Sequence, residues 1–244
     1  MTKGKTIPLL RLLNFLPFLR PVVRLFFRKT YPSLKKELIG LTFSGPVGIA
    51  AGVDKRGEYT DIIACFSPGF IEIGPVRDVR FAIQNLQQRE EDIVVLANLS
   101  NAQNIERVFS LIYDFVDAIV LNVSHGSTVS KIIEYLLEQR RYNDTYKPII
   151  FKLFSDLSPA ETDEVADYML RSGIDAVMIS AESVTMILEK THRLLPVIAI
   201  AEISTPGHAA QILDNGADLI AVTNSPARYG PRFIKRINKH LEKR

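Results

Sequence analysis

From residue 47 onward the chain alternates short apolar runs with longer stretches in which apolar residues recur every three or four positions. Continuous apolar runs are typical of parallel strands buried on both faces, and the longer period is typical of helices with one buried side. The predicted strands are residues 47–53, 70–74, 93–97, 118–123, 148–153, 176–180, 196–201 and 219–223. The clearest helical patterns lie between them, at 104–115, 129–141, 160–171 and 206–214.

Eight strand–helix units in about two hundred residues predict an α/β fold of the (β/α)8 TIM-barrel class. A doubly wound open sheet is the alternative, but it normally has fewer strands and a glycine-rich phosphate turn after the first strand. The chain contains no G-x-G-x-x-G motif. We therefore expect a barrel over residues 41–244, preceded by a basic, amphipathic helical arm over residues 1–40.

The arm differs sharply from the rest of the chain in charge. Residues 1–40 hold nine Lys or Arg and one acid, whereas the remaining residues carry 21 bases and 26 acids. Within the arm, residues 7–29 (IPLLRLLNFLPFLRPVVRLFFRK) place arginines between apolar residues at helical spacing, with a bend expected near Pro17 to Pro21. Two interpretations stay open: docking on an anionic membrane surface, or a helical hairpin that covers the barrel bottom or a partner subunit.

Composition excludes several classes of protein. Cys65 is the only cysteine, so the sequence predicts neither a disulfide framework nor a metal site. No apolar run reaches the ~20 residues that span a bilayer, and arginines interrupt the N-terminal apolar stretch where a secretory signal would lie. The barrel segment has no basic stripe suited to nucleic acid. We expect a cytoplasmic protein, peripheral on the inner face of the cytoplasmic membrane if the arm binds lipid.

The chemistry of a barrel lies at the carboxyl ends of its strands. Polar side chains follow or end several predicted strands, and these positions are the candidates for a functional site. They are Asp54 and Lys55 after the first strand, Asn98 after the third, residues 122–128 after the fourth, Lys152 at the fifth, Ser180 at the sixth, Glu202 at the seventh and residues 223–225 at the eighth.

Several of these segments are familiar. Residues 41–59 (LTFSGPVGIAAGVDKRGEY) closely resemble the opening of dihydroorotate dehydrogenases, in particular the quinone-dependent class 2 enzymes. Residues 69–76 (GFIEIGPV), 117–124 (DAIVLNVS) and 147–158 (KPIIFKLFSDLS) are similar to that family's second, fourth and fifth strands. The resemblance continues to the last helix and includes an N-terminal helical arm, so it extends along nearly the whole chain.

The resemblance implies a site for FMN, which in that family takes two electrons from dihydroorotate, yielding orotate for pyrimidine biosynthesis, and passes them to quinone. The positions matching the family's cofactor-binding residues are Ala51, Gly52, Asn98, Asn122, Lys152 and Ser180. Those matching its substrate-binding residues are Lys55, Asn122 and Ser127. His125 stands where the family has its catalytic serine base.

The chain also departs from the family. Its turn 122–128 reads NVSHGST in place of Asn-x-Ser-Ser-Pro-Asn-Thr, and residues 181–183 (AES) replace Asn-Thr-Thr. The glycine pair that receives the flavin phosphate becomes Ala201 and Glu202, with Arg228 the predicted partner of the new carboxylate, and residues 223–225 (TNS) replace Tyr-Ser/Thr-Gly. Only residues 75–92 separate strands two and three, where the family has a longer substrate-contacting insertion.

Three functions follow from these observations. The first is an active flavin enzyme that oxidises dihydroorotate or an altered substrate. The second is a divergent paralogue with impaired FMN and substrate sites that acts through protein contacts. The third is a non-catalytic scaffold whose basic arm docks on a membrane. The substitutions favour a divergent dihydroorotate dehydrogenase-like protein over a fully active enzyme.

Overall fold

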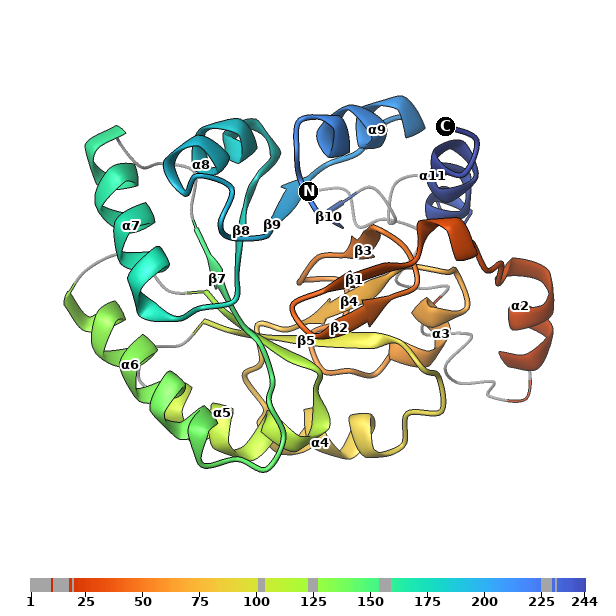
Figure 1. Ribbon diagram of the computed structural model, residues 1–244. Coiled ribbons are helices and arrows are strands. Elements are labelled where there is room, and N and C mark those ends of the chain that lie inside the picture. Colours follow the sequence, from red (N-terminus) through yellow and green to blue (C-terminus); the bar gives the residue numbers. More distant parts are fainter. Residues whose placement is uncertain are drawn as a thin grey trace.

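Figure 1 shows a ring of strands enclosed by helices in a computed structural model of the chain. The structure describes Leu10, Phe18, Gly230 and residues 20–100, 104–122, 127–153, 159–224 and 232–244.

The eight predicted strands form one closed parallel barrel in the order β10-β3-β4-β5-β6-β7-β8-β9, so the (β/α)8 prediction is confirmed. Each strand hydrogen-bonds to the next in the chain, and β10 closes the ring on β3. The strands are β3 (Val47–Ile49), β4 (Phe70–Ile73), β5 (Val94–Leu99), β6 (Ala118–Leu121), β7 (Ile149–Lys152), β8 (Ala176–Ser180), β9 (Val197–Ala201) and β10 (Leu219–Val222).

Helices cover the outside of the barrel (Figure 1). The four helical patterns identified in the sequence are confirmed as α5 (Ile105–Ile112) with the short η3 (Tyr113–Phe115), α6 (Ser127–Arg141), α7 (Pro159–Ser172) and α9 (Pro206–Asp214). The remaining ones are α3 (Thr60–Ala64), α4 (Val79–Gln87), η4 (Ala181–Ser183), α8 (Val184–Lys190) and α11 (Phe233–Leu241). Apolar side chains from strands and helices fill the layer between them.

The first barrel strand is shorter than its apolar run suggested. The sequence predicted a strand over 47–53, but β3 ends at Ile49. Beyond that point the amide of Ala51 donates to the side chain of Glu72 instead of to a neighbouring strand, and Gly52 has a φ of +104°. A positive φ turns the chain out of the extended conformation, which glycine tolerates because it has no Cβ.

The barrel interior below the carboxyl ends of the strands is apolar and tightly packed. Side chains alternate between the two faces of a strand, and the inward set forms its own cluster, which includes Phe70 and Leu96. A Cβ on Gly48 would lie 2.4 Å from the Phe70 ring, so only glycine leaves room for this aromatic residue. Phe43 packs edge-on against Phe70 with ring centroids 5.8 Å apart.

Phe43 belongs to a small antiparallel hairpin that precedes the barrel. Its strands are β1 (Lys36–Leu38) and β2 (Leu41–Phe43), and their apolar side chains pack against the interior cluster. The hairpin thereby closes the amino-terminal end of the barrel. The predicted division between arm and barrel after residue 40 falls in the turn of this hairpin, and it stays a prediction.

The arm continues into α2 (Arg20–Phe27), which confirms helix in that part of residues 7–29, followed by the short η2 (Pro32–Leu34). Of the predicted bend near Pro17 to Pro21, Pro17 lies outside the described residues, whereas Pro21 is the second residue of α2. The arginines of α2 turn toward the barrel: Arg20 pairs with Asp61 at 3.2 Å, and Arg24 pairs with Glu91 at 3.2 Å. Arg28, just after the helix, also pairs with Glu91.

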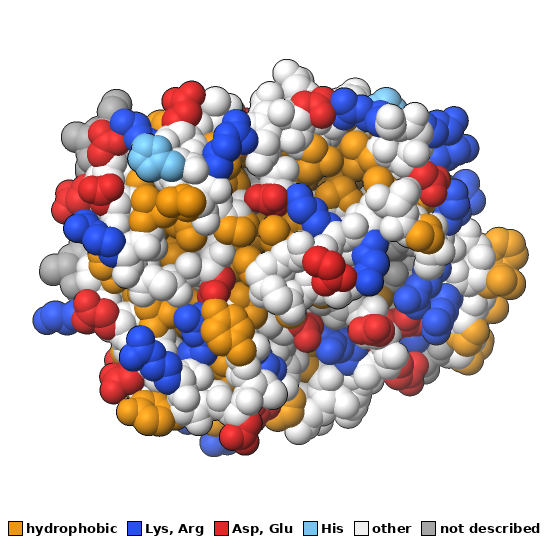
Figure 2. All heavy atoms as spheres, in the orientation of Figure 1, with side chains coloured by type: hydrophobic (Ala, Val, Ile, Leu, Met, Phe, Trp, Pro, Cys, Tyr) orange, Lys and Arg blue, Asp and Glu red, His pale blue; other side chains and the backbone are white. Residues whose placement is uncertain are grey.

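The apolar residues of α2 are mostly on its outer side. Leu25 is 79% exposed and Phe26 is 68% exposed, whereas Val23 is buried. Figure 2 shows apolar side chains at the edge of the molecule where Figure 1 places α2. The helix therefore uses its charges to attach to the barrel and presents an apolar surface outward, the reverse of an ordinary surface helix.

We expect Gly48→Ala to lower the free energy of unfolding by about 1–3 kcal/mol, because the added methyl group overpacks the barrel interior against Phe70. Urea unfolding followed by circular dichroism measures the change. Gly207→Ala is the matched control, since its Cβ would meet only the Thr205 hydroxyl at 4.0 Å. A second change, Phe70→Leu, should offset part of the loss in Gly48→Ala. Equal effects of the two alanine substitutions would contradict the close packing at Gly48.

Candidate functional site

Four consecutive strands place polar side chains at the carboxyl end of the barrel interior. Glu72, Asn98, Asn122 and Lys152 each lie two residues beyond an inward-facing apolar residue of β4, β5, β6 and β7, respectively. Because side chains alternate along a strand, all four point toward the barrel axis. The structure thus brings together three residues predicted from the sequence, Asn98, Asn122 and Lys152, around a fourth that was not predicted.

Glu72 is the centre of this group. Its side chain is fully buried. One carboxylate oxygen, Oε1, accepts hydrogen bonds from Asn98 Nδ2 at 2.6 Å and Lys152 Nζ at 2.8 Å. The other, Oε2, accepts from the Ala51 amide at 2.8 Å and from Lys152 Nζ at 3.2 Å. Three groups from three different strand ends therefore converge on one carboxylate.

The Glu72–Lys152 ion pair spans the barrel interior, since β4 and β7 are three strands apart in the ring. The Lys152 side chain is 13% exposed, so both charges are largely removed from water. Removing a charge from water is costly unless a partner and hydrogen bonds compensate it. The Glu72 carboxylate has a charged partner and additional hydrogen bonds. The charges of Glu72 and Lys152 also cancel each other.

A directional chain of hydrogen bonds leads from Glu72 to Asn122. A carboxylate only accepts, so Asn98 must direct its amide nitrogen toward Glu72 and its oxygen away from it. That oxygen accepts from Asn122 Nδ2 at 3.3 Å. Asn122 Oδ1 is left buried with no hydrogen-bond partner. A buried acceptor of this kind is unusual in proteins.

The loop after β3 carries Lys55 and is built on Asp54. The Asp54 carboxylate is buried and accepts hydrogen bonds from the amides of Arg56, Glu58 and Tyr59 and from the hydroxyl of Thr60. Burial raises the pKa of Asp54, and these hydrogen bonds oppose the rise. Lys55 itself is exposed and lies outside the Glu72 hydrogen-bond network.

The other predicted positions are distributed around the same end of the barrel. A Cβ on Gly52 would meet nothing within 4 Å, so open space lies above the backbone there. Ala51 contributes its amide to Glu72, and the Ser180 hydroxyl lies 3.1 Å from that of Ser183. His125 lies outside the described residues. Ser127 is the first residue of α6, and its side chain is likewise not described.

The ends of β9 and β10 carry the substitutions at the predicted phosphate position. Ala201 is the last residue of β9, and the exposed Glu202 follows it. Asn224 Nδ2 donates to Glu202 Oε2 at 3.5 Å, and the Thr223 hydroxyl donates to the Ala201 carbonyl at 3.3 Å. A carboxylate therefore stands beside the strand ends where the resemblance places a phosphate. The predicted partner Arg228 lies outside the described residues.

Glu72 is the residue that the sequence reasoning missed. It lies within the apolar run FIEIG, where strand alternation places it on the same face as Phe70. A single carboxylate inside a strand buried on both faces is itself a signal, because such a charge must find a partner. Lys152 and Lys55 were the only lysines among the strand-end candidates, so the sequence offered two possible cationic partners for Glu72.

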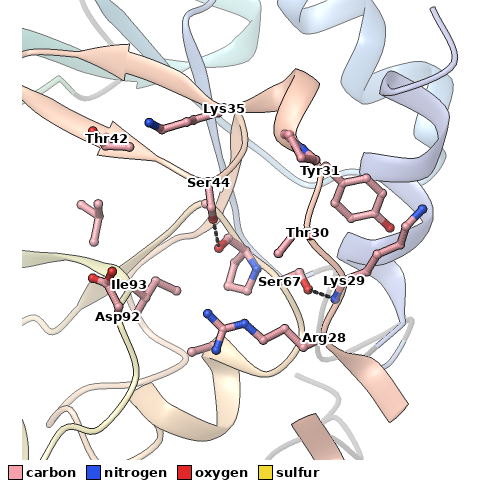
Figure 3. Close-up of a pocket in the computed structure, with 15 residues that line it drawn as sticks. Arg28, Lys29, Thr30, Tyr31, Lys35, Thr42, Ser44, Ser67, Asp92 and Ile93 are labelled. Carbon is pink, nitrogen blue, oxygen red and sulfur yellow. Dashed lines mark hydrogen bonds between the residues drawn. The ribbon is translucent and has the colours of Figure 1, made fainter. Parts of the chain in front are cut away.

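A cavity of about 350 Å³ lies at the opposite, amino-terminal end of the barrel. Figure 3 shows its lining, which comes from the segment after α2, the hairpin and the loops that precede β4 and β5. Its cations already have acidic partners: Arg28 pairs with Glu91, Lys29 with Glu242 and Lys35 with Glu37. Among the described residues, no cluster of three or more His, Cys, Asp or Glu could hold a metal ion. The carboxyl end remains the candidate site.

No protein-family model matches the chain, but individual proteins do. The chain is 23% identical to a dihydroorotate dehydrogenase (quinone) of Actinobacillus pleuropneumoniae, with 85% of this chain and 87% of the relative covered. It is 22% identical to a protein of the same name from Photobacterium profundum, with 92% of each covered. The first alignment spans 293 positions, more than the 244 residues of this chain, so the relative has segments that this chain lacks.

The chain is also similar to solved structures of dihydroorotate dehydrogenase. The ligand-free dihydroorotate dehydrogenase of Eimeria tenella matches 93% of this chain with a TM-score of 0.79 at 18% identity, covering 92% of its own length. The complex of that enzyme with ferulenol matches 92% of this chain, and 90% of its own, with a TM-score of 0.78. The resemblance read from the sequence is confirmed, in a shortened and divergent form.

We expect Lys152→Met to lower the free energy of unfolding by about 3–5 kcal/mol, because it leaves the Glu72 carboxylate buried without its cation. The double variant Glu72→Gln/Lys152→Met should recover much of the loss, because it removes the buried charge together with its partner. Urea unfolding measures the wild-type protein and both variants.

Lys190→Met is the matched control for this experiment. Lys190 pairs with Asp163, but both side chains are largely exposed, so its loss should cost no more than about 1 kcal/mol. Equal destabilisation by the two lysine substitutions would contradict the importance assigned to the buried pair.

Proposed function

We propose that this chain, whose sequence and fold are similar to those of quinone-type dihydroorotate dehydrogenases along most of its length, is a divergent dihydroorotate dehydrogenase-like protein with impaired FMN and substrate sites. The observation that carries the proposal is the contrast between the two sides of the barrel top. One side keeps a connected set of polar groups suited to a flat polar ring. The other side has a carboxylate where the phosphate of FMN would lie.

The ring side supports a flavin site. Open space lies above Gly52, and Asn122 Oδ1 is a buried acceptor without a hydrogen-bond partner. Lys152 and Asn98 both donate to Glu72, and Asn122 donates to Asn98, so the three side chains belong to one hydrogen-bonded set. When bound, FMN would supply two-electron redox chemistry. The residues that would contact its ring are Ala51, Gly52, Asn98, Asn122, Lys152 and Ser180.

The phosphate side does not fit FMN. Phosphate sites in proteins use backbone amides at close approach and positive or neutral surroundings. Glu202 supplies a negative charge, and Ala201 adds a side chain that the family's glycine lacks. At the end of β9, therefore, neither the close approach to the backbone nor the positive or neutral surroundings that a phosphate requires are present. We therefore assign the protein weak FMN binding.

The substrate side is altered as well. His125 takes the position of the family's base, and imidazole is a competent general base near neutral pH. A base works only on a substrate held within its reach, however, and Ser127 and residues 181–183 replace amide side chains that hold substrate in the family. The short segment 75–92 also removes the covering insertion. Lys55 remains as the cation for a substrate carboxylate.

We expect the protein purified without added cofactor to contain far less than one FMN per chain and to oxidise dihydroorotate no faster than a buffer control. Absorbance of the released flavin measures the first, and quinone reduction measures the second. The variant Ala201→Gly/Glu202→Gly/Ser225→Gly should bind FMN more tightly, by about tenfold or more, because it removes a like charge and restores the approach to the backbone. Stoichiometric FMN together with dihydroorotate-dependent quinone reduction in the unchanged protein would overturn the proposal.

A second candidate function is favoured by α2: docking on an anionic membrane surface through residues 7–29, as a peripheral scaffold. Among the described residues, no helix is long and apolar enough to cross a membrane. Leu25, Phe26, Phe18 and Val22 are exposed, and such side chains enter the interfacial layer of a bilayer. Since Arg20, Arg24 and Arg28 pair with acids of the barrel, the apolar side chains would supply most of the binding free energy.

We expect Leu25→Ser/Phe26→Ser to reduce binding to vesicles of mixed neutral and anionic lipid several-fold, with much of the wild-type binding kept at high salt because apolar contacts are not screened. Vesicle sedimentation measures the bound fraction. Leu111→Ser/Tyr142→Ser is the matched control, as it removes two exposed apolar residues from other parts of the surface. Equal binding by the two variants would contradict the membrane role of α2.

A further inference from the structure

The outer face of α11, the last helix of the chain, gathers five positive charges. The helix buries its apolar side chains, among them Phe233, Ile234 and Ile237, in the core. Lys and Arg residues recur at helical spacing on the other side, so they share one face. We call this set the α11 cations: Arg232, Lys235, Arg236, Lys239 and Lys243. Lys235 is partly buried and the other four are exposed.

Acids of the protein leave this positive charge uncompensated. Two ion pairs form at this end of the chain, but both use other residues. Glu242 pairs with Lys29 at 3.4 Å, and Asp214 pairs with Arg244 at 2.7 Å. Within the described ranges, no carboxylate forms an ion pair with an α11 cation. Because acids outnumber bases over residues 41–244, a count of charges does not reveal this face.

The α11 cations lie beside the end of α2. The guanidinium of Arg232 lies 5.5 Å from the centroid of the Phe27 ring, and Phe27 is the last residue of α2. The Tyr31 hydroxyl donates to the carbonyl of Lys235 at 3.1 Å. Figure 2 shows Lys and Arg side chains along the edge of the molecule where Figure 1 places α11, next to the apolar side chains of α2. A positive surface and an exposed apolar surface are therefore neighbours.

A bilayer that contains anionic lipid fits this combination. Clusters of about four to eight Lys or Arg on an amphipathic helix are typical of binding to anionic lipid, and exposed apolar side chains enter the interfacial layer. The arginines of α2 have little charge to offer, because they pair with Asp61 and Glu91. Surfaces that bind nucleic acid are more polar than this one, and nucleic acid would leave Leu25 and Phe26 in water.

We propose that α11 recognises anionic lipid headgroups, while α2 supplies the apolar contacts with the bilayer. The proposal rests on the second candidate function, docking through α2, and extends it to a helix at the other end of the chain. The two helices have separate effects: α2 determines whether the protein binds a bilayer at all, and α11 determines which lipids it prefers.

The test uses the whole protein and two kinds of vesicle, phosphatidylcholine alone and phosphatidylcholine mixed with phosphatidylglycerol. We expect Arg236→Gln/Lys239→Gln/Lys243→Gln to bind the mixed vesicles about 10- to 100-fold more weakly than the wild-type protein, because each cation near an anionic surface contributes roughly fivefold. Its affinity for phosphatidylcholine alone should not change. Leu25→Ser/Phe26→Ser should instead weaken binding to both kinds of vesicle by a similar factor. Vesicle sedimentation measures every affinity.

Arg107→Gln/Lys131→Gln/Arg171→Gln is the matched control. It removes the same number of exposed cations from α5, α6 and α7, which lie across the barrel from α11 (Figure 1). This variant should bind both kinds of vesicle as the wild-type protein does. Circular dichroism establishes that each variant is folded, and all six substitutions are at exposed positions.

The outcomes separate this proposal from the docking role of α2. An equal loss for the two triple variants, or equal affinity of the wild-type protein for the two kinds of vesicle, would overturn the role of α11 and leave docking through α2 intact. Failure of the wild-type protein to bind any vesicle would overturn both. A short DNA duplex is the last probe: if it displaces the protein from the mixed vesicles, α11 is a nucleic-acid surface and the proposal is wrong.

Discussion

The buried ion pair between Glu72 and Lys152 is the interaction on which the rest of the barrel top depends. Two charges withdrawn from water are tolerable inside a protein only when they compensate each other and their remaining hydrogen bonds are made. The closed barrel meets this condition by bringing β4 and β7 to opposite sides of one interior, with Asn98 and Asn122 on the two strands between them. Strand alternation alone then orders the four side chains into one polar layer above an apolar floor.

The two sides of the barrel top differ in how much the fold constrains their side chains. One side is the polar layer around Glu72, and the other is formed by the ends of β9 and β10. On the proposed function, the ring side persists because most of its polar groups, Asn122 Oδ1 excepted, hydrogen-bond to one another and therefore contribute to folding as well as to binding. The strand ends around Glu202 are exposed, and side chains there are not required by the barrel. Substitutions at such positions change ligand binding at little cost in stability. On the proposed function, this separation explains how a chain can share the barrel of dihydroorotate dehydrogenases at about one-fifth identity while the residues at the proposed phosphate position differ.

The sequence was sufficient for the architecture and for part of the site. Eight apolar runs located the strands within a few residues, and the rule that barrel chemistry lies at strand ends selected Asn98, Asn122 and Lys152. Glu72 was missed because the strand-end rule selects residues at the end of a strand, whereas Glu72 lies within β4 and its partner is 80 residues away. The orientation of α2 could not be predicted either. Its periodicity defines two faces, but the face that turns inward is determined by Asp61 and Glu91 on the barrel, which pair with its arginines.

On the proposed function, the barrel top has kept its affinity for a flavin ring and lost its affinity for the flavin phosphate. Riboflavin and FMN differ only by that phosphate, so the ratio of their dissociation constants for the wild-type protein, measured by fluorescence quenching at one ionic strength, isolates its effect. We expect riboflavin to bind more tightly than FMN. Tighter binding of FMN would show that the phosphate is still recognised and would contradict this expectation.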